Sequence, residues 1–137
     1  VAPTAKLFST ASTCPVLIFT AEGSSSVRRR ALEEAGAIVV PLPDHEGRVQ
    51  PRDMLEYLHS KGVLGVIVEG GGHTHAQFLQ SGLVDKVQWF LAPRVLGDSR
   101  GAAAVDGGRR TLESAWNLRI AGLERVGEDV VLSLYPS

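Results

Sequence analysis

The chain has 137 residues, about the length of one domain, with 44% apolar and 21% charged residues. Fourteen basic side chains against fifteen acidic ones give a formal net charge of -1, so no overall positive field indicates a nucleic acid or a membrane as partner. No apolar run approaches the roughly 20 residues that a membrane span needs. A single cysteine, Cys14, excludes an internal disulfide and fits a reducing compartment, so we expect a cytoplasmic protein with one domain, residues 1–137.

The first half of the chain predicts strands that alternate with helices. Residues 15–20 and 37–42 are short apolar runs rich in β-branched side chains, typical of strands covered on both faces. Residues 24–35 carry apolar side chains at helical spacing, and serines are available to cap that helix. Pro51 can begin a further helix, which we expect to end before Gly62.

The second half predicts one more buried strand over residues 63–68 and then a helix that ends at Gly82. Thr74 and Gln77 have the spacing of a capping box, so this helix is expected to start near Thr74. A further strand is expected over residues 86–92.

The last part of the chain has a different pattern. Residues 97–108 are small and polar and predict a mobile loop. Residues 118–126 and 130–135 flank a short turn and predict an antiparallel hairpin. The fold class is therefore α/β, with a mainly parallel central sheet flanked by helices and a C-terminal antiparallel hairpin. Ligands of such sheets bind beyond the carboxyl ends of the strands.

One junction stands out, where the run from Val66 reaches Glu69, three glycines and two histidines before the helix starts. Glycines let a ligand approach the main chain, and a helix start presents unpaired N–H groups and the positive end of its dipole. An anion such as a phosphate suits this place. The alternative is a tight strand-to-helix turn without a ligand. The common dinucleotide and Walker patterns do not fit these residues.

A metal is the third option at this junction. Glu69, His73 and His75 include side chains that ligate zinc, but histidines two positions apart at a helix start diverge. No cysteine or further histidine cluster completes a site, so no metal is expected. The Glu69 carboxylate ends an apolar run and needs donors, either from a ligand or from local backbone N–H groups.

Three blocks of this sequence together resemble a known family. They are VEGGG (68–72), FLQSGLVD (78–85) and APRVLG (92–97). Their order and spacing are similar to those of the reductase domain of the riboflavin-biosynthesis deaminase-reductases, a relative of dihydrofolate reductase. The strand over residues 15–20 and the closing hairpin also look like that domain, so the resemblance spans nearly the whole chain.

The resemblance implies a function and a site. The family reduces the ribosyl group of 5-amino-6-(5-phosphoribosylamino)uracil to ribityl with NADPH as hydride donor, and a homodimer is expected. Glu69 would face the pyrimidine nucleotide substrate, and Thr20 is a weaker candidate near the adenosine 2′-phosphate. No catalytic residue is assigned. The residues that would bind the NADPH phosphates are Gly71, Gly72, His73, Thr74, His75, Ala76 and Gln77.

The sequence also departs from the family pattern. Nothing here corresponds to the first strands and the lysine of the reductase domain, or to the zinc deaminase with its H-x-E and P-C-x-x-C signature. The chain is thus expected to be the larger, C-terminal part of a pyrimidine reductase domain, either as a fragment or within an oligomer. Two alternatives are a catalytically inert nucleotide-binding or assembly module and a related dihydrofolate-reductase-like enzyme with another substrate.

Overall fold

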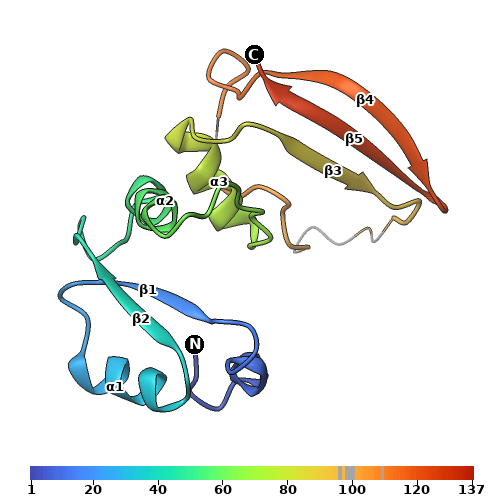
Figure 1. Ribbon diagram of the computed structural model, residues 1–137. Helices are drawn as coiled ribbons and strands as arrows, with labels where there is room; N and C mark the ends of the chain where they lie inside the picture. The colour runs from blue at the N-terminus through green and yellow to red at the C-terminus, as the bar shows by residue number, and fades with distance from the viewer. Residues whose placement is uncertain (96, 98–100, 109) are drawn as a thin grey trace. The chain divides into compact units, whose positions relative to one another are not determined.

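The computed structural model describes residues 1–95, 97, 101–108 and 110–137 (Figure 1). Contacts between residues divide the chain into two compact units, Val1–Leu64 and Gly65–Ser137. The expectation of a single domain over residues 1–137 stays a prediction. In the part of the chain that the structure covers, no helix is both long and apolar enough to cross a membrane.

The first unit begins with a short 3-10 helix, η1 (Lys6–Thr10), and continues as a strand, a helix and a second strand. These are β1 (Leu17–Ala21), α1 (Ser26–Glu34) and β2 (Ile38–Leu42). Helix α1 ends where the sequence predicts, because Gly36 takes a φ of +96°, which other residues rarely adopt. Strands and helix are confirmed within one or two residues of the predicted bounds.

The two strands of this unit pair in parallel, with Leu17 opposite Ile38 at the start of the ladder. Helix α1 packs on β2, and the small apolar core of the unit lies between them. Its buried side chains are Leu32, Ala37, Val40 and Leu42. Burial of one such leucine side chain stabilises the folded state by about 1.5 to 3 kcal/mol. Because a β-α-β unit can pair in parallel only through such a crossover, the observed pairing confirms the predicted α/β pattern here.

Helix α2 (Pro51–Ser60) completes the first unit. Pro51 lies at the start of the helix, where its missing N–H costs nothing, as predicted. The helix contacts the sheet through Tyr57, whose ring packs edge-to-face on Phe19 with 5.6 Å between the centroids. Gly62, with a φ of +82°, follows the helix as expected.

The predicted strand over residues 63–68 is wrong. The backbone there belongs to no strand, and the side chains of Leu64 and Ile67 are 93% and 86% exposed. An extended segment becomes a strand only when a neighbour completes its hydrogen-bond ladder, and no described residue pairs with this one. The apolar run instead forms the connection at the boundary of the two units.

The second unit starts with helix α3 (Gly72–Ser81), which ends at Gly82 in the left-handed conformation, as predicted. Its start differs from the prediction. Gly71 is the N-cap and makes no side-chain cap bond, so Thr74 lies inside the first turn and the capping box with Gln77 does not form. Buried Ala76 and Phe78 attach the helix to its unit.

A three-stranded antiparallel sheet forms the rest of the second unit. Its strands are β3 (Val87–Leu91), β4 (Leu118–Val126) and β5 (Asp129–Pro136), with β5 in the middle (Figure 1). The β4–β5 hairpin turns at Gly127, which has a φ of +64°, and confirms the predicted C-terminal hairpin. The α/β class is confirmed, although among the described residues the parallel pairing comprises β1 and β2, whereas β3 runs antiparallel to β5.

The predicted loop over residues 97–108 lies partly outside the described residues, since 98–100 are not described. Residues 101–108 contain no helix or strand, as expected. Their place in the unit was not anticipated, because they pack against the first turn of α3. The predicted mobility of the loop stays a prediction.

Candidate functional site

The glycine stretch leads directly into helix α3, and its backbone sets the geometry of the candidate site. Gly71 is extended, with φ -79° and ψ 176°, and its carbonyl accepts the hydrogen bond of the His75 N–H at 3.1 Å. The first N–H groups of a helix have no partner within the helix, and here no side chain caps them. Since the positive end of the helix dipole lies at the same place, the turn from Gly71 to Thr74 suits an anion.

The three consecutive positions are occupied by glycine for different structural reasons. A Cβ on Gly70 would lie 2.6 Å from the Cβ of Thr74, and a Cβ on Gly72 would lie 2.5 Å from the carbonyl oxygen of Ala103. Both distances are too short for real atoms, so the fold itself requires these two glycines. A Cβ on Gly71 would meet nothing within 4 Å, and its φ is one that any residue adopts. Gly71 is therefore the glycine that the chain's own packing does not explain.

The two histidines of the stretch point to backbone carbonyls of a distant segment. His73 Nδ1 lies 2.9 Å from the carbonyl oxygen of Asp106, and His75 Nδ1 lies 2.8 Å from that of Ala104. His73 Nε2 also lies 3.4 Å from Asp106 Oδ2. The two rings thus have different partners, and no group of three metal-ligating side chains occurs within the described residues. That no metal binds stays a prediction.

Glu69 lies two residues before the N-cap of α3. Because the strand over residues 63–68 does not form, its carboxylate does not end a buried strand, and the residue is exposed. The expected local capping role is also not observed, since no described backbone N–H donates to it. The side chain is therefore available at the surface beside the glycine stretch. Its proximity in the chain to Gly71 places both candidates at the same junction.

The remaining candidates of the stretch differ in burial. Thr74 and His75 are half-buried, Gln77 is exposed, and the Ala76 side chain is buried against the unit. A ligand at the first turn would therefore meet the backbone of Gly71 to Thr74, whereas Ala76 contributes packing. Gln77 is one turn further along the helix.

Thr20 lies in the first unit, near the carboxyl end of β1. Its hydroxyl oxygen is buried and has no hydrogen-bond partner among the described residues, as is also true of the Ser24 hydroxyl. The loop between these residues lies close to the loop after β2, since a Cβ on Gly23 would be 3.2 Å from Asp44 Oδ2. Carboxyl ends of parallel strands are where such sheets bind ligands, so Thr20 has the position that the sequence predicts.

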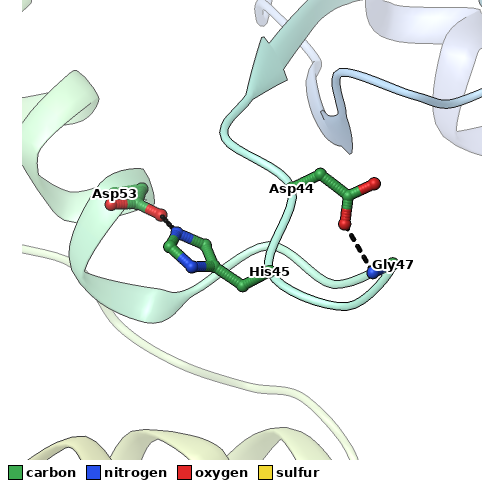
Figure 2. A network of polar contacts seen from close by, with 4 residues as sticks. All are labelled: Asp44, His45, Gly47 and Asp53. Atoms are coloured by element: carbon green, nitrogen blue, oxygen red, sulfur yellow. Dashed lines mark hydrogen bonds and ion pairs between the residues drawn. The ribbon is translucent and has the colours of Figure 1, made fainter.

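A polar network follows β2 in the same unit (Figure 2). His45 Nε2 contacts Asp53 Oδ2 at 3.1 Å, and the Asp44 carboxylate accepts a hydrogen bond from the Gly47 N–H. Asp53 lies in the first turn of α2, where a carboxylate is stabilised by the helix dipole. The network attaches the loop to the helix. The sequence did not indicate Asp53 as the partner of His45.

Sequence reasoning missed the segment around Ala104 and Asp106, which contacts the first turn of α3. The histidines bond across 29 and 33 residues, and no local pattern contains such a pairing. The close approach is visible at Gly72 only once the structure shows that α3 begins there, because the predicted helix starts two residues later.

The helices and strands described above form an α/β fold. Two solved structures share the fold. RibD from Acinetobacter baumannii aligns over 100% of this chain and 35% of its own, with a TM-score of 0.76 and 24% identity. A pyrimidine reductase-like protein from Corynebacterium diphtheriae aligns over 88% of this chain and 48% of its own, with a TM-score of 0.68 and 18% identity.

Residues 1–132 match the family described as RibD C-terminal domain, and the chain belongs to that family. The riboflavin biosynthesis protein RibD of Bacillus amyloliquefaciens is 28% identical over 123 residues, which cover 89% of this chain and 33% of that protein. A 2,5-diamino-6-ribosylamino-4(3H)-pyrimidinone 5′-phosphate reductase of Archaeoglobus fulgidus is 36% identical over 83 residues, which cover 61% of this chain and 36% of that protein. The chain thus spans about a third of the length of these two relatives.

Proposed function

We propose that this chain is the cofactor-binding part of an NADPH-dependent reductase of riboflavin biosynthesis. The reaction would reduce the ribosyl group of 5-amino-6-(5-phosphoribosylamino)uracil to ribityl. Membership of the RibD C-terminal domain family supports a pyrimidine reductase that uses a nicotinamide cofactor. The choice of NADPH and of this nucleotide as substrate is part of the proposal.

The observation that carries the proposal is Gly71. Gly70 and Gly72 are required by neighbouring atoms of the chain, but Gly71 faces open space beside the uncapped first turn of α3. A ligand phosphate that approaches this backbone would explain why no side chain stands there. The N–H groups of Gly72, His73 and Thr74 would donate to the diphosphate of the cofactor.

The glycine stretch and Glu69 would have different tasks in the proposed reaction. The stretch from Gly71 to Gln77 would bind and orient the cofactor, which supplies the hydride when bound. Glu69, exposed beside the stretch, would accept hydrogen bonds from hydroxyl groups of the substrate. Holding the two reactants in a fixed relative orientation is the main contribution of a protein to such chemistry.

The direct test is a titration of the 137-residue chain with NADPH, followed by nicotinamide fluorescence, with NADH as the comparison. Saturable binding that is tighter for NADPH is the expected result. Equal affinity for the two cofactors would contradict the choice of NADPH. Failure to bind either one would contradict the dinucleotide site in this chain.

A further inference from the structure

Residues 103–107, called the strap below, lie along the first turn of helix α3. The Asp106 N–H donates to the carbonyl oxygen of Gly72 at 3.0 Å, and the two histidines of the turn contact the Asp106 and Ala104 carbonyl oxygens. Three hydrogen bonds therefore connect the strap to one helical turn. This turn carries the N–H groups assigned above to the cofactor.

The close approach depends on two glycines, one from each side. A Cβ on Gly72 would lie only 2.5 Å from the carbonyl oxygen of Ala103 in the strap. In the strap, a Cβ on Gly107 would lie 2.9 Å from the Cβ of Ala76 and 3.2 Å from the ring of Trp116. Side chains at either position would push the strap away from the helix. A glycine on the helix and a glycine in the strap thus leave the space for this contact.

The partners of the histidines fix their proton positions. A carbonyl oxygen can only accept a hydrogen bond, so Nδ1 of His73 and Nδ1 of His75 must each carry the proton and donate it. The Nδ1 atoms are therefore not free for a phosphate. His73 Nε2 lies 3.4 Å from Asp106 Oδ2, and both side chains are largely exposed.

We propose that His73 and His75 are positioning residues, which hold the strap on the first turn of α3 so that the strap fixes the backbone N–H groups of that turn for an anion. This inference rests on the proposed function, because it takes the anion to be the cofactor's diphosphate. It changes the role of two candidates, since their side chains act through residues 103–107 and only their backbone meets the ligand. The strap thereby becomes part of the binding site without contacting the cofactor.

The test compares His75→Leu with His75→Asn in the 137-residue chain. Leucine removes the donor, whereas the Asn amide nitrogen can take the place of Nδ1 and donate to the Ala104 carbonyl. Hydrogen exchange of the Asp106 amide measures strap docking without any cofactor, because this amide donates to Gly72. NADPH titration measures the effect on binding.

For His75→Leu we expect Asp106 exchange about fivefold faster and NADPH affinity about fivefold lower, the effect of one lost hydrogen bond. His75→Asn should restore both values to near those of the wild type. Unchanged exchange in His75→Leu would overturn the inference, and so would faster exchange with unchanged affinity. If the wild type does not bind NADPH, the proposed function fails, and the exchange data alone still decide whether the histidine holds the strap.

A second pair of variants tests docking through the backbone. Gly72→Ala places a Cβ against the Ala103 carbonyl oxygen and should also accelerate Asp106 exchange. Gly71→Ala is the matched control for docking, because its Cβ meets nothing within 4 Å, and Asp106 exchange should stay unchanged. Equal exchange in the two variants would contradict the close contact between strap and helix.

Discussion

At the scale of single residues, the three glycines after Glu69 separate requirements of the fold from requirements of a ligand. Gly70 and Gly72 leave room for Thr74 and Ala103, and Gly71 leaves room that no described atom uses. From the sequence, the three glycines were assigned one shared role, because nothing in a run of glycines distinguishes one position from the next. The structure distinguishes Gly71 as the glycine that faces open space.

Gly71→Val should therefore weaken NADPH binding at least about tenfold by a steric clash with the phosphates. The same substitution should lower the free energy of unfolding by about 1 kcal/mol, because valine is a poorer N-cap residue than glycine. Gly70→Ala should instead cost about 1 to 3 kcal/mol, since its Cβ overlaps the Thr74 side chain. Urea unfolding and a cofactor titration of both variants check this. Unchanged NADPH affinity of Gly71→Val would reject the assignment of the glycine stretch.

Glu69→Gln keeps the size of the side chain and removes its charge. We expect NADPH affinity within about twofold of the wild type, because the proposed phosphate site lies at α3, and a kcat/KM reduced by about 10-fold or more. The assay needs a preparation of the reductase that turns over, with stopped-flow detection of NADPH oxidation. A normal kcat/KM would exclude the substrate role of Glu69.

At the scale of elements, local patterns predicted what local physics determines. Helix α2 starts at Pro51, helix α3 ends at Gly82, and the hairpin turns at Gly127, each for a conformational reason visible in one residue. The strand over residues 63–68 was predicted wrongly from apolar content, because such content indicates burial but does not supply a ladder partner. The start of α3 was missed since its first turn is held by residues about thirty positions away.

The candidate site shows the same limit. The prediction that the stretch binds an anion rests on the glycines and the helix start, and both features are visible in the sequence. The partners of His73 and His75 were not predictable, because nothing in the composition of residues 103–107 marks them as a contact of α3. Long-range contacts of this kind depend on the tertiary fold.

In the antiparallel sheet, stability should depend on the middle strand more than on the edge. Leu134 of β5 is 8% exposed and Leu123 of β4 is 70% exposed. Leu134→Ala should lower the free energy of unfolding by about 2 to 4 kcal/mol, and Leu123→Ala by less than about 1 kcal/mol. Thermal and urea unfolding measure both. Equal losses would mean that the Leu123 side chain is covered in solution.

At the scale of the whole molecule, charge restricts the range of partners. With a net charge of -1, the chain should not bind duplex DNA measurably at physiological salt, because phosphate neutralisation needs many basic contacts. Fluorescence anisotropy with a labelled duplex checks this, and a saturable, salt-dependent signal would contradict it. The homodimer and the cytoplasmic location stay predictions, the first of which sedimentation measurements can test.

The contact between Gly107 and Trp116 gives the protein an intrinsic optical reporter. The Arg110 guanidinium lies 3.7 Å from the centroid of the Trp116 ring, so the indole is bordered by a cation as well as by the strap. The chain has two tryptophans, and Trp89→Phe would leave Trp116 as the single source of indole emission. Strap release would change the polarity around this ring, and its emission spectrum could then follow the strap in real time.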